Sequence, residues 1–401
     1  MPFFRGALGA LLLLAFAFPA HGRQSESILG TSVNLTGGAT NRLQSSSSQP
    51  AGNGLSTAFY GVYPSLSLTS MRRSSSLRAN YGFGFNRRLG TSRQPGSDSH
   101  TASLNFSTAL GPRWSAGLED SLTVTGDLGT FSALSGVSSV QGINSLFSPV
   151  ATGRSLRTNR VDGDLTWALD QNSSVSFRVA HNLRKYGSGA LSSGFLSDQQ
   201  QYQGSVTFQQ RLGVGDSWSL GYTSTYFDRK NSTDTLSQSA QAGYALHVGR
   251  DMTMHISAGL SQVNNQGSSG GYLGYDATAL LEKTLVSNRF SVGYTQDSKE
   301  SIGIGSNFTT RRATLDWDRA FGKITASASA SVYDSKGTLN NGLRVRGVRA
   351  SGNVGYPITR TLSISGGATY QSTRKTGIFD FTQERVFFSL RYSEPNLKRF
   401  H

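Results

Sequence analysis

The sequence contains no cysteine and only 9 prolines in 401 residues. Without cysteine the chain forms no disulfide bond, no thiolate metal site and no lipid anchor of the lipoprotein type. Hydrophobic residues make up 36% of the chain, and beyond the N-terminus no stretch approaches the ~18 consecutive apolar residues of a membrane-spanning helix. The composition therefore excludes a disulfide-stapled domain and a helical membrane protein.

The N-terminus has the pattern of a secretory signal peptide. Arg5 supplies the positive charge, and the apolar core runs from Gly6 to Phe18, within the usual ~7–15 residues. Pro19 ends this core, and small residues follow up to Gly22. We predict a cleaved signal peptide over residues 1–22, because a retained spanning helix would need ~20 apolar residues.

Glycine and aromatic residues are abundant, with 47 Gly, 22 Phe and 15 Tyr. In many segments apolar residues recur at every second position, as they do from Leu77 to Phe85. This period of two places two different sets on the two faces of a β-strand. The intervening residues are mainly Ser, Gly, Asn, Gln and Thr, which favours the crowded interior of a barrel over the solvated face of a soluble sheet.

Short and long connections alternate along the chain, as they do in outer-membrane barrels with short periplasmic turns and long outer loops. We therefore predict an all-β fold, a transmembrane antiparallel up-and-down β-barrel of about 18 strands (16–18). The barrel is expected over residues 23–392, and a short periplasmic tail over residues 393–401. Pro64 falls inside a predicted strand and removes a ladder hydrogen bond, so we expect a β-bulge or a strand boundary there.

The four tryptophans support a membrane barrel. Trp114, Trp167, Trp218 and Trp317 all belong to the apolar set of their strands, and each lies beside a predicted short turn. Indole prefers the boundary between hydrocarbon and headgroups. We predict that the four residues form the membrane-interface girdle on the periplasmic side.

The same alternation predicts which charged side chains line the lumen. These pore candidates are Arg78, Arg178, Arg289, Arg349, Arg385, Arg391, Glu119, Asp162, Asp164, Asp276, Asp316 and Asp318. Charges of both signs across a pore select solutes by charge. Because the two signs nearly cancel here, we expect weak selectivity, tilted toward anions by the overall basic excess. Arg–Asp pairs that only brace the wall explain the same residues equally well.

The sequence offers little for catalysis or for cofactors. His247 and His255, with Ser257 and Ser261 on the same predicted face, could serve a lipase-like barrel, but polar lining of the lumen is the preferred interpretation. Carboxylates one pleat apart, such as Asp162 with Asp164, could hold Ca²⁺, although no ligand loop accompanies them. We therefore predict no enzyme activity, no metal site and no cofactor.

The formal net charge is +15, but the basic residues are scattered rather than gathered in one tract. This pattern does not indicate nucleic-acid binding. Basic pairs at predicted outer strand ends, such as Arg311-Arg312 and Arg374-Lys375, could engage phosphates of lipopolysaccharide. Solvated loop charge accounts for them equally well.

The longest predicted loop, residues 126–157, carries an apolar residue about every third position, from Phe131 to Val150. An exposed loop should not present so much apolar surface. We consider two hypotheses: the loop folds inward and narrows the pore, or it caps the outer end and packs on itself or on a neighbouring subunit.

The sequence resembles bacterial outer-membrane β-barrels of the porin type in four features: the predicted signal peptide, the alternating hairpins, the tryptophans and the strand Val386–Tyr392. The resemblance implies a C-terminal assembly signal, with Leu390 and Tyr392 at its outward positions. Two features depart from that signal: Phe387 occupies a position where a small residue is expected, and the chain continues for nine residues beyond Tyr392.

The expected function is passive diffusion of small polar solutes across the bacterial outer membrane, with a weak preference for anions. The alternatives are a barrel for export of polysaccharide or another surface polymer, and a structural or adhesive barrel with a closed lumen. The expected partners are outer-membrane lipid and lipopolysaccharide, the barrel-insertion machinery and small polar solutes, and a homo-oligomer is compatible with the sequence.

Overall fold

The protein is described from a computed structural model. It describes residues 26–46, 55–89, 97–125, 156–186, 198–213, 215–229, 234–265, 271–301, 306–337, 344–375 and 379–400. The predicted signal peptide and the 126–157 loop up to Ser155 lie outside these residues. Within the described ranges, no helix is long and apolar enough to cross a membrane.

The described chain forms 18 β-strands. They are β1 (Glu26–Ser46), β2 (Leu55–Met71), β3 (Ser75–Leu89), β4 (Ser97–Ala109), β5 (Trp114–Thr125), β6 (Leu156–Ala168), β7 (Ser173–Tyr186), β8 (Gln199–Arg211), β9 (Ser217–Arg229), β10 (Thr235–His247), β11 (Met252–Asn265), β12 (Gly271–Leu285), β13 (Asn288–Ser301), β14 (Ser306–Phe321), β15 (Ile324–Gly337), β16 (Arg344–Pro357), β17 (Leu362–Lys375) and β18 (Phe379–Phe400).

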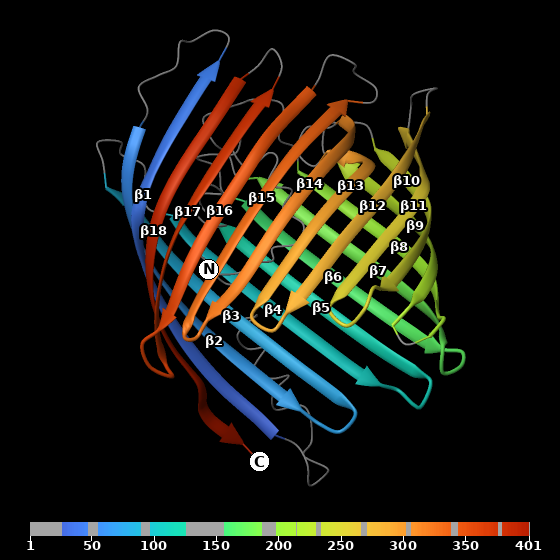
Figure 1. The fold of residues 1–401 in the computed structure, drawn as a ribbon, viewed down its shortest axis with the longest axis horizontal. Coiled ribbons are helices and arrows are strands. Elements are labelled where there is room, and N and C mark those ends of the chain that lie inside the picture. The colour runs from blue at the N-terminus through green and yellow to red at the C-terminus, as the bar shows by residue number, and fades with distance from the viewer. Residues whose placement is uncertain are drawn as a thin grey trace.

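Each strand pairs antiparallel with the next along the chain, and β1 also pairs with β18. This last pairing closes the sheet into a barrel, whose tilted strands are visible in Figure 1. Closure leaves no sheet edge, so the backbone can satisfy its hydrogen bonds within the wall when hydrocarbon surrounds it. The predicted up-and-down barrel of 18 strands is confirmed.

The final strand is longer than the sequence suggested. Residues 393–400, expected as a tail, continue β18 and pair with the start of β1, from Ser393 opposite Ser32 to Phe400 opposite Ser27. The register shifts once, between Leu29 and Thr31. The C-terminus leaves the barrel at the end that carries the short turns (Figure 1).

Pro64 lies inside β2 without the expected bulge. The register of β2 with β3 is the same on both sides of it, with Val62 opposite Phe85 and Ser65 opposite Gly82. The β1 side keeps its pairing through Pro64, opposite Val33. The proline therefore interrupts the ladder with β3 locally but does not displace the strand.

The two faces of the wall differ as the alternation predicts. In β12, Leu273 and Tyr275 are 69% and 53% exposed, whereas the next residue, Asp276, is 4% exposed. Exposed apolar side chains recur at alternate positions in the other strands, for example Val33 and Leu35 in β1. A wall with its large apolar residues outside is built for contact with lipid.

Aromatic rings on the inner face lie against the wall where glycine leaves room. The Tyr333 ring occupies the space into which a Cβ of Gly347 would project, and its hydroxyl shares a hydrogen bond of 2.9 Å with Thr373 Oγ1. Tyr63 covers Gly61 and Gly84 in the same way. These rings therefore pack along the wall and do not project across the lumen.

This packing predicts that Gly347→Ala destabilises the barrel. The new methyl group would displace the Tyr333 ring and break its hydrogen bond to Thr373, at a cost of about 1–3 kcal/mol. Urea unfolding in lipid vesicles, followed by tryptophan fluorescence, measures the change. Gly204→Ala is the matched control, because no atom lies within 4 Å of the added methyl group in β8. Equal stability of the two variants would contradict this account.

Candidate functional site

The inner wall is the candidate site, and all twelve predicted pore residues alternate with lipid-facing neighbours in their strands. Arg78 lies between Leu77 and Ala79, and Glu119 follows the exposed Leu118. Alternation along a strand therefore assigns them to the inward face. Their surroundings differ greatly, however, and divide them into groups.

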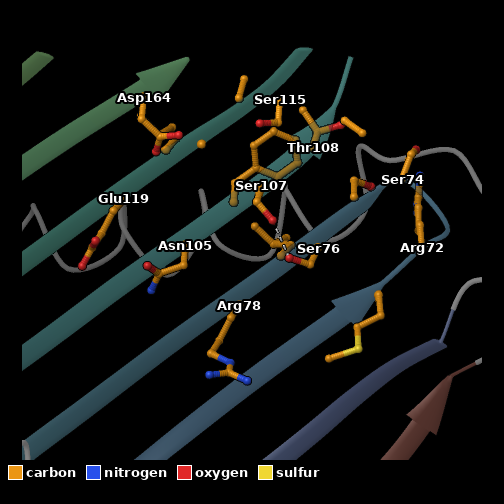
Figure 2. A pocket seen from close by; sticks show the side chains of 18 of the residues that line it. Arg72, Ser74, Ser76, Arg78, Asn105, Ser107, Thr108, Ser115, Glu119 and Asp164 are labelled. Atoms are coloured by element: carbon orange, nitrogen blue, oxygen red, sulfur yellow. Dashed lines mark hydrogen bonds between the residues drawn. The ribbon is translucent and has the colours of Figure 1, made fainter. Parts of the chain in front are cut away.

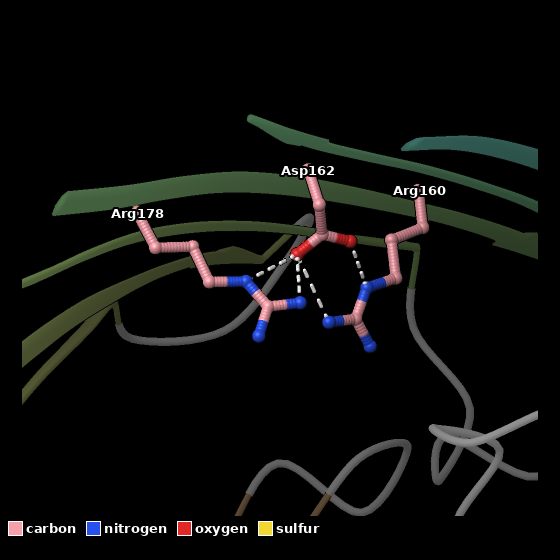
Figure 3. A network of polar contacts seen from close by, with 3 residues as sticks. All are labelled: Arg160, Asp162 and Arg178. Carbon is pink, nitrogen blue, oxygen red and sulfur yellow. Dashed lines mark hydrogen bonds and ion pairs between the residues drawn. The ribbon is translucent and has the colours of Figure 1, made fainter. Parts of the chain in front are cut away.

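The most connected group surrounds Asp162 on β6 (Figure 3). Arg178 on β7 donates to its Oδ1 from Nη2 at 2.7 Å and from Nε at 3.1 Å. Arg160, two residues earlier on β6, donates from Nη2 to Oδ1 at 3.0 Å and from Nε to Oδ2. The carboxylate is buried, while the side chains of Arg160 and Arg178 are 36% and 49% exposed.

One carboxylate thus fixes two guanidinium groups, and these three side chains together carry a formal charge of +1. Farther up the same hairpin, Arg184 is a buried inward-facing cation on β7, opposite Thr158. Arg160 and Arg184 were not among the predicted pore residues. The alternation that identified Asp162 and Arg178 also marks these two residues, because they lie an even number of positions away on the same strands.

Asp276 is buried in the wall, with 4% of the residue exposed. The carboxylate accepts hydrogen bonds from Ser298 N at 2.9 Å, Ser261 Oγ at 3.2 Å and Gln241 Nε2 at 3.2 Å. The pairing of β12 with β13 ends at Ala277 opposite Gln296. Just beyond this point, the Asp276 carboxylate accepts the backbone N–H of Ser298. These bonds give Asp276 a structural part in the wall, and its predicted contact with solutes stays a prediction.

Arg385 on β18 is also buried within the wall. Only 2% of the residue is exposed, and its guanidinium lies over the ring of Phe59 on β2, 4.2 Å from the centroid. A cation on an aromatic face is held by the ring quadrupole. This contact spans β1 and joins β18 to β2 on the inner face of the wall.

A third group lies near the short turns of β12–β14. Arg289 Nη2 donates to Glu282 Oε1 at 2.9 Å, and it pairs in register with Asp318. Asp316 accepts from Ser291 Oγ at 3.2 Å. Glu282 was not among the predicted residues. With three carboxylates and one guanidinium, this part of the wall is formally negative.

Arg78, Glu119 and Asp164 share an open cavity of about 810 Å³ on the inner wall, near the turns of β2–β6. Figure 2 shows Arg78 on one side of this cavity and the two acidic side chains on neighbouring strands, with Asn105 between them. The remaining candidates are separate: Arg349 is half-buried on β16, and Arg391 is exposed on β18, opposite Ser363 at the start of β17.

The four tryptophans lie close to the short turns, on the lipid-facing set. Trp114 and Trp167 are directly opposite in register, and their rings stack at 5.3 Å with an interplanar angle of 2°. Trp218 contacts Phe208 at 5.2 Å between ring centroids, and Trp317 lies opposite Phe290. Their depth in a membrane remains a prediction.

Among the described residues, no group of three or more His, Cys, Asp or Glu side chains could hold a metal ion. His247 lies opposite Thr253, and His255 lies opposite Ala245 on the adjacent strand. Both histidines are exposed.

No protein-family model matches the sequence, and no match is found among curated proteins. Solved structures share the fold. Pseudomonas aeruginosa OccK9 (OpdG) has a TM-score of 0.50 at 14% identity, over 91% of this chain and 98% of that chain. Pseudomonas aeruginosa OpdK, solved with vanillate, has a TM-score of 0.50 at 12% identity, over the same shares of the two chains. At these identities the likeness concerns the fold alone, which is the predicted outer-membrane type of β-barrel.

The hydrogen bonds of Asp276 predict that Asp276→Ala destabilises the barrel by about 2–4 kcal/mol, because a buried backbone N–H and two side-chain donors lose their acceptor. Asp164→Ala is the control, since Asp164 is an exposed carboxylate on the same inner face, and its removal should change stability by less than about 0.5 kcal/mol. Urea unfolding of both variants measures the difference. A loss at Asp164 as large as that at Asp276 would contradict the structural role.

Proposed function

We propose that the protein is a bacterial outer-membrane channel for passive diffusion of small polar solutes. One observation carries the proposal: a closed wall of 18 strands has apolar side chains outside and polar ones inside. Barrels of about 16–18 strands leave an aqueous channel. The inner-face aromatic rings Tyr63 and Tyr333 lie along the wall, over glycine, which keeps them out of this space.

The proposal includes a weak preference for anions, located on the β6–β7 hairpin. Arg160 and Arg178 are held by one carboxylate and remain partly exposed. A fixed, partly exposed guanidinium pair attracts carboxylate and phosphate groups. Glu119, opposite Asp162 in register, offsets part of this charge, so the preference is weak.

One comparison agrees with small organic anions as solutes. OpdK, a solved structure with this fold, was determined with vanillate, which is a carboxylate. A carboxylate is a group that paired arginines recognise well.

Planar-bilayer recording tests both parts. The wild-type protein should give stable open channels, and a salt gradient should give a reversal potential that favours anions. The double variant Arg160→Gln/Arg178→Gln should lower the anion-to-cation permeability ratio by about two- to threefold, because it removes two fixed charges from the pore wall. Arg319→Gln is the matched control, since Arg319 lies on the lipid-facing set of β14 next to Phe321.

Two results would contradict the proposal, and they are distinguishable. Electrical silence of correctly folded wild-type protein would exclude the open channel and would support a barrel with a closed lumen. Open channels with equal permeability ratios in the wild type and the double variant would exclude the anion preference at Arg160 and Arg178 alone.

We also propose that the barrel-insertion machinery recognises the last strand, on which Leu390 and Tyr392 are exposed and lipid-facing. Exposed apolar positions on an assembled wall are what a lipid-inserting partner would contact first. Lipopolysaccharide and further copies of the chain belong to the same set of proposed partners.

The tryptophan girdle predicts a shallow location for the indole rings. In vesicles of lipids brominated at different acyl positions, fluorescence quenching should be strongest with bromine near the headgroups, because the rings lie at the interface. A variant with Leu260→Trp and phenylalanine at the four native positions should be quenched most by deeper bromines, since Leu260 is lipid-facing and far from the turn. Native fluorescence quenched most strongly from the bilayer centre would contradict the girdle.

A further inference from the structure

A row of charged side chains crosses four neighbouring strands on the outside of the barrel. Arg311 on β14 lies opposite Asp334 on β15, which lies opposite Arg346 on β16, which lies opposite Arg374 on β17. Each residue alternates with lipid-facing neighbours such as Leu315, Val332, Val348 and Tyr370. Figure 1 shows these strands side by side in the wall.

The side chains of this row hold one another in place. Asp334 Oδ1 accepts from Arg344 Nε at 2.7 Å, and Arg344 Nη2 donates to Asp334 Oδ2. Arg346 Nε lies 3.4 Å from Asp334 Oδ1. Arg311 Nε donates to Gln296 Oε1 at 3.1 Å, and that oxygen also accepts from the Tyr294 hydroxyl at 3.3 Å. Arg344 and Arg346 nevertheless keep 43% and 58% of their side-chain surface exposed.

Positive charge exceeds negative charge on this face. Its acidic positions are Asp334 and, on β18, Asp380 opposite Arg374 and Glu384 opposite Tyr370. Its basic positions are the four arginines 311, 344, 346 and 374, and Lys336 opposite Arg344. The formal balance is five positive charges against three negative, or +2. Charged side chains on the lipid face are costly within hydrocarbon and cost little near the interfaces, so the row belongs at the level of headgroups.

The spacing of the two lipid-facing arginines along β14 agrees with a location of the row at the headgroup level. Arg319 and Arg311 are eight positions apart on the same lipid-facing set, and only Trp317, Leu315 and Ala313 lie between them on that face. Eight residues span about 27 Å along a strand, or about 20 Å across a membrane at the usual tilt. The two arginines thus bound the apolar band, and Arg311 lies at its outer edge, away from the short turns.

Val332, Val348 and Tyr370 border the row on the side of the turns. Beyond them, a group of small residues occupies the lipid-facing set of β15–β17: Ala326, Ala328, Ala330, Ala350, Gly352, Gly366 and Ala368. One register line runs Trp317, Ala328, Gly352, Ala368, Val386, so bulkier residues border the small ones on both sides. Small residues allow extended acyl chains to lie flat against the strands.

We propose that this outer face binds the phosphorylated glycolipid of the outer leaflet, the lipid A part of lipopolysaccharide. Its phosphates would contact Arg311, Arg346 and their neighbours, and its acyl chains would lie on the small residues below. Guanidinium groups bind phosphate in a bidentate manner. A second copy of the chain fits this face poorly, because it would bring the same excess of positive charge against the row.

The proposal rests on the outer-membrane location included in the proposed function, but it does not depend on an open channel. The test uses the purified full-length barrel in detergent, titrated with lipid A and followed by native mass spectrometry. The double variant Arg311→Gln/Arg346→Gln should bind lipid A about thirtyfold more weakly, as expected for two basic residues at a lipid surface. Dephosphorylated lipid A should bind the wild type with a similar loss.

Arg319→Gln, at the opposite boundary of the apolar band, is the matched control and should bind lipid A as the wild type does. Conductance of the double variant should stay unchanged, which separates this site from the pore. Equal affinity of the wild type and the double variant, or equal binding of phosphorylated and dephosphorylated lipid, would overturn the proposal. Dimers that form without lipid and disappear in the double variant would also overturn it and would assign the face to a second copy.

Discussion

The wall depends on one constraint: each backbone N–H and C=O that faces hydrocarbon needs a partner inside the protein, because lipid offers none. An antiparallel sheet satisfies all but its two edges, and the pairing of β1 with β18 removes those edges. Deviations from the regular ladder are accordingly few and local. At Pro64 the register continues unchanged, and beyond Ala277 a side chain, Asp276, accepts the N–H of Ser298.

The period of two was sufficient to predict the barrel and its strand number, because each strand must separate lipid from lumen along its whole length. The same pattern assigns the charged residues to the inward-facing set, but it does not show what surrounds each side chain. Asp276 and Arg385 share the inward set with Arg178, yet the first bonds to the backbone of β13 and the second lies over Phe59. These contacts join residues far apart in sequence, so local alternation contains no information about them.

Other differences have equally physical origins. Arg160 and Glu282 follow the alternation and were overlooked, although each pairs with a residue of opposite charge that was predicted. The tail beyond Tyr392 joins β18 because the start of β1 offers a free edge opposite it, a pairing that requires the three-dimensional arrangement of both ends. The positions of aromatic rings over glycine, such as Tyr333 over Gly347, likewise become visible only when strands are aligned.

The closure has a further consequence for how this wall is made. Most strand pairs are hairpins, whose partners are neighbours in the chain, whereas Ser389 and Asn34, joined by a side-chain hydrogen bond, are 355 positions apart. Contacts of large sequence separation form slowly, because the intervening chain must first lose its conformational entropy. Pairing between neighbouring strands therefore precedes the pairing of β1 with β18. The open barrel, in which these two edge strands are still unpaired, is the species that assembly has to protect.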